Sequence, residues 1–138
     1  MKRMCLTLLL AFGLIAGLIF AVQAQSPHET LKQYVADLQK NPNDYALREK
    51  IIRHVQTMQP VPPIPEEARR HYVMAKTLLE GAKKAEDFAD SVAEFKAAVL
   101  VAPWWAEANR DLGLALEATQ QFDEAISYIR LYIATNPG

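Results

Sequence analysis

Beyond residue 26, apolar side chains recur at steps of three and four residues, the spacing that places them on one face of an α-helix. The first such stretch opens with Ser26-Pro27-His28-Glu29, where an N-cap serine, an early proline and a glutamate form a capping box. Asn41-Pro42 ends this helix. The same criteria predict further helices at about 43–58, 66–85, 88–101, 106–119 and 122–135. Because the turns between them are short, we expect an all-α stack of antiparallel helices.

A proline-rich segment interrupts this pattern between the second and third helices. Residues 59–65 hold four prolines, which remove the amide donors that a helix needs and favour an extended conformation. We interpret the segment as a stiff linker that wraps the helices, with Val61 and Ile64 turned inward. A docking strand for a proline-binding domain is the alternative, since PxxP spacing occurs twice.

The second half of the chain repeats itself at an interval of 34 residues. In this register, apolar or proline positions coincide at Leu78/Leu112, Phe88/Phe122, Val92/Ile126, Phe95/Ile129, Val99/Ile133 and Pro103/Pro137. Self-similarity at a fixed period indicates a unit that cannot bury its apolar face alone and therefore stacks on a copy of itself. We call residues 72–105 unit 1 and residues 106–138 unit 2; each holds two helices.

Unit 2 resembles a tetratricopeptide (TPR) repeat. The positions that carry the resemblance are Leu112-Gly113, Leu116, Phe122, Asp123-Glu124-Ala125-Ile126, Tyr128 and Asn136-Pro137. Unit 1 keeps Leu78, Phe88, Ala98 and Pro103, but has Leu79 and Ser91 where the motif prefers glycine and alanine, which implies a wider helix spacing. The resemblance implies a short right-handed solenoid over residues 66–138. The helical hairpin at 25–58 looks like the back helix of one repeat and the front helix of the next.

The first 24 residues have the organisation of a secretory signal peptide. A positive head, Met1-Lys2-Arg3, precedes an uncharged run over residues 4–22, and Val22-Gln23-Ala24 offers small residues for cleavage before Gln25. The run approaches the roughly 20 residues that span a bilayer, so an uncleaved membrane anchor is the alternative. The folded part is therefore predicted to be periplasmic or secreted, or else anchored in the inner membrane and facing the periplasm.

Composition and charge narrow the classes of partner. Without Lys2 and Arg3 the chain carries 13 basic against 16 acidic residues, which gives no electrostatic reason to expect nucleic acid or an anionic membrane surface as a partner. Contact with a membrane is expected only through residues 4–22, if they are not cleaved. Cys5 lies within the signal segment, so the mature chain is expected to have no disulfide and no thiol nucleophile.

The sequence offers no constellation of catalytic residues. His28, His54 and His71 fall on three different predicted helices, and none has a partner at metal-ligand spacing. The neighbouring acids Glu66-Glu67 and Asp123-Glu124 point in different directions on a helix, whereas acid–base catalysis needs convergent carboxylates. We therefore predict that the protein is not an enzyme and binds neither metal nor cofactor.

The TPR resemblance implies a concave groove lined by the front helix of each repeat. We call the corresponding set the front-helix face: Val73, Lys76, Thr77, Glu80, Lys83, Glu107, Arg110, Asp111, Leu114 and Glu117. Its mixed charge and two apolar residues suit an amphipathic peptide or helix. Glu80 and Leu114 stand where family members that grip a C-terminal carboxylate have asparagine or basic residues, so we do not expect that mode. The alternative is that these charges only solvate a helix surface.

A second candidate surface lies at the C-terminal end. Repeat arrays usually finish with a capping helix whose outer face is polar, but the last predicted helix here is apolar. Ile126, Ile129 and Ile133, which we call the C-terminal patch, are left without a neighbour, as is Leu114. An exposed apolar patch implies a partner, so self-association or partner docking is predicted there.

Taken together, these features predict a non-catalytic adaptor or scaffold of the cell envelope that binds a protein partner through the front-helix face. Two alternatives stay open. One is a self-associating structural subunit tethered by an uncleaved N-terminal helix. The other is an accessory subunit of an envelope enzyme complex.

Overall fold

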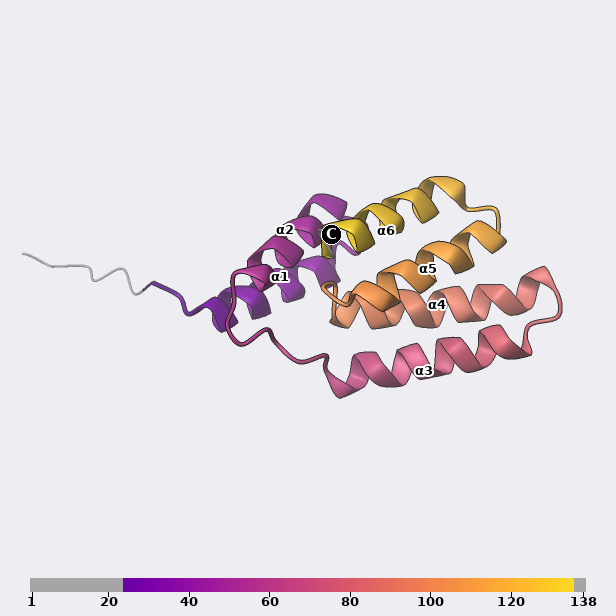
Figure 1. Ribbon diagram of the computed structural model, residues 1–138, viewed down its shortest axis with the longest axis horizontal. Coiled ribbons are helices and arrows are strands. Elements are labelled where there is room, and N and C mark those ends of the chain that lie inside the picture. Colours follow the sequence, from indigo (N-terminus) through magenta and orange to yellow (C-terminus); the bar gives the residue numbers. More distant parts are fainter. Residues whose placement is uncertain (1–23, 136–138) are drawn as a thin grey trace, which may run out of the picture.

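The computed structural model describes residues 24–135, which form six α-helices and no strand (Figure 1). This confirms the all-α prediction. The predicted signal segment lies, except for Ala24, outside the described residues, as does the closing turn of unit 2. The helices are α1 (Pro27–Lys40), α2 (Tyr45–Gln56), α3 (Glu66–Gly81), α4 (Ala85–Val101), α5 (Ala106–Ala118) and α6 (Phe122–Thr135).

The ends of the helices follow the local signals, with one exception. The Ser26 hydroxyl accepts a hydrogen bond from the Glu29 amide at the start of α1, as the capping box predicts. The predicted break at residues 86–87, between the helices expected at 66–85 and 88–101, is wrong, because α3 already ends at Gly81 and α4 begins at Ala85. The Asp87 carboxylate accepts from the backbone amides of Lys83 and Lys84, at 2.9 and 3.2 Å. Asp87 therefore caps α4 from within its first turn, where the helix dipole favours an acid.

Helices α3 to α6 follow one another in chain order across the view of Figure 1, and we call them the helical layer. Within it, α3 packs on α4, α4 on α5 and α5 on α6. Alternate helices also touch, since Tyr72 of α3 contacts Asp111 of α5 and Lys96 of α4 contacts Glu124 of α6.

Among the residues that the 34-residue register equates, Phe95, Val99 and Leu112 are fully buried and lie in the core. The helices of unit 2 pack closely at Gly113, where a Cβ atom would lie 2.6 Å from the end of the Ile129 side chain.

The TPR resemblance implied that the N-terminal hairpin would precede α3 in the stack, but the structure places the hairpin elsewhere. Instead α1 packs against α4 and α2 packs against α6. The proline-rich linker spans the distance back to α3 (Figure 1). Pro62 is buried in it and Ile64 is half-buried, but Val61 is exposed, contrary to our expectation. A second, smaller core joins α1 and α2 around Leu31, Leu38, Ile51, Val55 and Met58.

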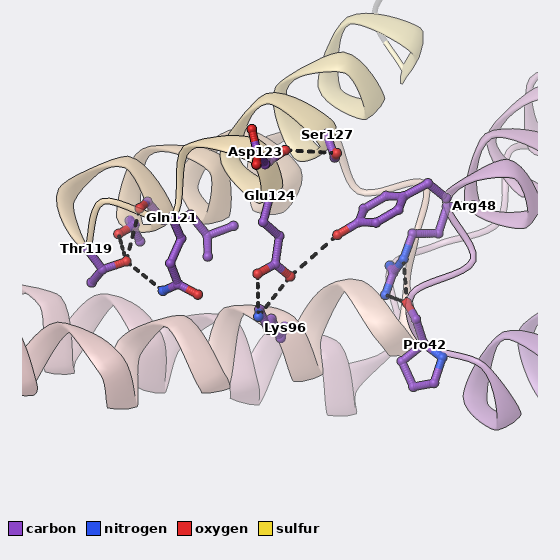
Figure 2. A network of polar contacts seen from close by, with 11 residues as sticks. Pro42, Arg48, Lys96, Thr119, Gln121, Asp123, Glu124 and Ser127 are labelled. Carbon is purple, nitrogen blue, oxygen red and sulfur yellow. Dashed lines mark hydrogen bonds and ion pairs between the residues drawn. The ribbon is translucent and has the colours of Figure 1, made fainter.

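The buried side chain of Arg48 explains why the hairpin docks there. Its Nη1 donates to the carbonyl of Val99 at 2.9 Å. Its Nε and Nη2 both donate to the carbonyl of Pro42 (Figure 2). The Val99 carbonyl would ordinarily accept from the amide four residues on, but that residue is Pro103, which has no N–H. Arg48 thus supplies the missing donor and places a positive charge at the C-terminal end of α4, where the helix dipole favours it.

Candidate functional site

Asp111 is the polar centre of the front-helix face. From α3, the Tyr72 hydroxyl donates to Asp111 Oδ2 at 2.7 Å, and Lys76 Nζ lies 3.6 Å from the same atom. From α5, Arg110 contacts Oδ1, with Nη2 at 2.8 Å and Nε at 2.9 Å. The Asp111 side chain is only 8% exposed. This carboxylate therefore joins unit 1 to unit 2 and offers little surface to a partner.

The surroundings of Asp111 favour its ionised form. Burial by itself would raise the pKa of Asp111, but the hydrogen bonds from Tyr72 and Arg110 and the charges of Arg110 and Lys76 outweigh burial and lower it. Burial and the bond to Asp111 raise the pKa of Tyr72 to about 12. Both groups are therefore held in the forms that make this contact at neutral pH, a neutral phenol donating to a carboxylate.

We expect Asp111→Asn to lower the free energy of unfolding at neutral pH by about 1–3 kcal/mol, because the ionic contacts to Arg110 and Lys76 are lost. A group whose pKa is lower in the folded chain stabilises it above its unfolded pKa, near 4, and that contribution disappears as the pH falls through the folded value. Urea unfolding of both proteins should therefore show a difference at pH 7 that shrinks below about pH 4. A difference that stays constant down to the lowest pH would contradict this account.

Five other members of the front-helix face lie in three places. Lys76 and Arg110 flank Asp111. Val73 and Thr77 line an open depression of about 670 Å³ on the outer side of α3, together with Glu66, Arg69, Arg70 and Met74. Glu117 borders a hollow of about 320 Å³ between α5 and α6. The remaining members, Glu80, Lys83, Glu107 and Leu114, are exposed.

The centre of this face combines positive charge with apolar surface. Lys76 and Arg110 bring two positive charges to one carboxylate, so one positive charge remains in excess around Asp111. Val73 and Leu114, on the same two helices, are among the exposed large apolar side chains. Such a surface suits binding of an acidic group with apolar neighbours.

The C-terminal patch is exposed, with Ile126 at 50% and Ile133 at 60%, while Ile129 is half-buried. Phe122 belongs to the same surface, and sequence reasoning missed it although the register pairs it with Phe88. The opposite side of α6 does have a neighbour, since Tyr45 of α2 stands edge-on against Tyr128 at 5.6 Å. Gln56 of α2 also donates to the carbonyl of Ala134 at 2.7 Å. The patch is therefore one face of α6, not the whole helix.

Two tryptophans and two histidines have structural contacts. Trp105 lies against Tyr72, with 4.5 Å between ring centroids, and Trp104 touches both cores. His54 Nε2 lies 2.8 Å from the Pro27 carbonyl, and His71 Nδ1 lies 2.7 Å from Glu94. Within residues 24–135, no three side chains of metal-binding type gather in one place. None of the six helices described is both long and apolar enough to cross a membrane.

No protein-family model, curated protein or solved structure matches this chain.

Proposed function

We propose that this protein is a non-catalytic adaptor of the cell envelope that binds an amphipathic peptide or helix of a partner protein on its front-helix face. The observation that carries the proposal is the convergence of Lys76 and Arg110, from different helices, on one largely buried carboxylate. Their surplus positive charge lies on helices that also expose Val73 and Leu114.

The chemistry of this face defines the ligand. An acidic side chain of the ligand enters between Lys76 and Arg110, whose exposed nitrogens retain unused donors. Apolar residues of the ligand cover Val73 and Leu114, which are now in contact with water. Glu80, Glu107 and Glu117 are exposed on the same two helices, α3 and α5, and favour basic residues elsewhere in the ligand.

The proposed location and binding mode draw on the sequence. The charge pattern of residues 1–24 supports export, with cleavage before Gln25 or retention as an inner-membrane anchor as the two possible outcomes. The resemblance of residues 106–138 to a TPR repeat supports the use of a front-helix surface for protein binding. N-terminal sequencing of the purified protein distinguishes a soluble adaptor, which starts at Gln25, from an anchored subunit, which starts at Met1.

The test is capture of a partner from a detergent-solubilised envelope extract with the protein as bait. Wild type is expected to retain a discrete partner, and the double variant Lys76→Gln/Arg110→Gln to bind it at least about tenfold more weakly, since charged hydrogen bonds are lost. Glutamine avoids placing a new acid beside Asp111. The matched control is Lys32→Gln/Lys40→Gln, which neutralises two exposed lysines on α1.

Equal capture by wild type and the double variant would place the binding site elsewhere and overturn the role of this face. Circular dichroism of each variant checks that helicity is unchanged. Isothermal titration with a synthetic peptide from the captured partner then measures the affinity directly.

A further inference from the structure

The first and last helices of the layer, α3 and α6, expose surfaces that correspond, in the 34-residue register, to the two sides of the contact between α5 and α4. Inside the molecule, Val92, Phe95 and Val99 of α4 are buried in the core that α5 completes. Their counterparts 34 residues on are Ile126, Ile129 and Ile133, the C-terminal patch. This patch is exposed because no described helix packs on α6 as α5 packs on α4. The patch is therefore equivalent to a surface on which, inside the molecule, another helix packs.

The opposite end of the layer carries the matching half. Ala108, Leu112 and Ala115 of α5 are buried in the same core as the α4 residues. In the register, their counterparts on α3 are Met74, Leu78 and Gly81. Met74 is 52% exposed, and it lines the depression on the outer side of α3. In a stack that followed chain order the N-terminal hairpin would cover this side, but it packs on α4 and α6 instead.

The charges at the two ends are complementary in the same register. Inside the molecule, Lys96 of α4 points toward Glu124 of α6 and forms an ion pair at 2.8 Å (Figure 2). The counterpart of Lys96 is Arg130, and the counterpart of Glu124 is Asp90. Arg130 and Asp90 are both exposed, and each carries a charge of the same sign as its counterpart. Within one molecule, α5 and α6 follow α4. If α3 and α4 of a second molecule followed α6 in the same way, Arg130 would face Asp90 of that second molecule.

We infer that the protein assembles head to tail with copies of itself, with α6 of one molecule packed on α3 of the next as α4 packs on α5. The occupant of the C-terminal patch is thus the α3 face of a second copy. The bond between Tyr72 and Asp111 has no equivalent in this contact, because Ala106 and Thr77 hold the corresponding positions. The contact between molecules is therefore weaker than the one within a molecule, and the assembly is reversible.

The proposed contact determines the symmetry of the assembly. The two surfaces in the contact are different, so the interface is heterologous and each added molecule presents a new free end. Such a contact produces open chains or closed rings, and does not stop at a two-fold dimer. The inference does not depend on the ligand of the front-helix face, because purified protein alone reports on it.

The first experiment exchanges the charges of the proposed ion pair. Sedimentation velocity of the full chain, as the cell processes it, is expected to show species that grow beyond dimers as concentration rises. Arg130→Asp and Asp90→Arg should each weaken assembly by about fivefold or more, because each places like charges opposite one another. The double variant restores opposite charges and should assemble about as well as wild type. Lys32→Asp, on the exposed surface of α1, is the control and should have no effect.

The second experiment blocks one end at a time. Met74→Glu places a charge on the α3 face, and Ile126→Glu places one on the C-terminal patch; both positions are exposed, so folding should be retained. Neither variant should assemble alone. A mixture of the two should form dimers and nothing larger, because each variant contributes one intact end.

Three outcomes would overturn the inference. Wild type that stays monomeric at hundreds of micromolar shows that the ends do not associate. Dimers formed by Met74→Glu alone show that the C-terminal patch pairs with itself. A charge-exchanged double variant that assembles no better than the single variants shows that Arg130 does not meet Asp90. If a glutamate variant loses helicity, Met74→Lys and Ile133→Lys block the same two surfaces.

Discussion

Replacing Arg48 by alanine is expected to release the N-terminal hairpin from α4 and α6. The substitution leaves the carbonyls of Val99 and Pro42 without their donor. The Val99 carbonyl, left buried without a partner, costs about 1–3 kcal/mol, and the loss of the buried Arg48 side chain and its contacts to the part-buried Pro42 carbonyl adds to this, so we expect the free energy of unfolding to fall by about 3 kcal/mol. Because Pro103 has no N–H, the ordinary α-helical bond from four residues on cannot replace the donor to Val99.

Hydrogen exchange is the measurement that identifies this mechanism. In Arg48→Ala, amide protection should fall throughout α1 and α2, while α3, α4 and α5 remain protected, since the larger core does not need the hairpin hydrogen bonds. Arg53→Ala is the matched control, because Arg53 is an exposed arginine on the same helix that pairs only with Glu49. A uniform loss of protection in all six described helices would mean that Arg48 stabilises the whole fold and not the docking of the hairpin.

The second large effect is expected at Gly113. Even an added Cβ atom would lie 2.6 Å from Cδ1 and 2.8 Å from Cγ1 of Ile129, so Gly113→Leu forces α5 and α6 apart. Overpacking of this kind costs typically about 1–3 kcal/mol, and we expect a value at the upper end, measured by urea unfolding. The equivalent position in unit 1 is Leu79, which is half-buried between α3 and α4.

Two controls connect this loss to the contact with Ile129. A Cβ atom added at Gly81 would have no neighbour within 4 Å, so Gly81→Ala should be neutral or stabilising by up to about 1 kcal/mol. In an Ile129→Ala background, Gly113→Leu should cost less than in wild type, since the space that leucine needs has been vacated. Equal costs in the two backgrounds would show that the strain lies elsewhere.

The sequence predicted the elements of this fold because their determinants are local. The N-cap serine before α1 and the apolar spacing along α6 need no knowledge of distant residues, and both helices begin where expected. The 34-residue register includes two fully buried core residues, Phe95 and Leu112, but it also includes Ile126 and Ile133, which are exposed. The turn before α4 was misplaced because Asp87 has two local roles, turn residue and helix cap, and its sequence neighbours do not decide between them.

The position of the hairpin was not predictable from the same signals. The missing amide at Pro103 is visible in the sequence, but the donor that replaces it, Arg48, is 51 residues from Val99. Arginine is also a residue type that is usually found at the surface. The candidate site shows the same limit. Lys76 and Arg110 were predicted to share a face with Asp111. The hydrogen bond from Tyr72 that makes Asp111 largely inaccessible to a partner joins residues 39 apart in the sequence. Such contacts depend on how helices pack and on side-chain conformation, which periodicity does not encode.

The docking of α2 on α6 also sets an order of events during folding. Tyr45 approaches Glu124 across 79 residues of chain, and Gln56 reaches Ala134 across 78. Ribosomes deliver the N-terminus first, so α1 and α2 emerge while the surfaces that cover them do not yet exist. Until α6 is complete, the apolar stripe of the hairpin is available to chaperones and proteases. The segment made first is therefore expected to acquire its native contacts last.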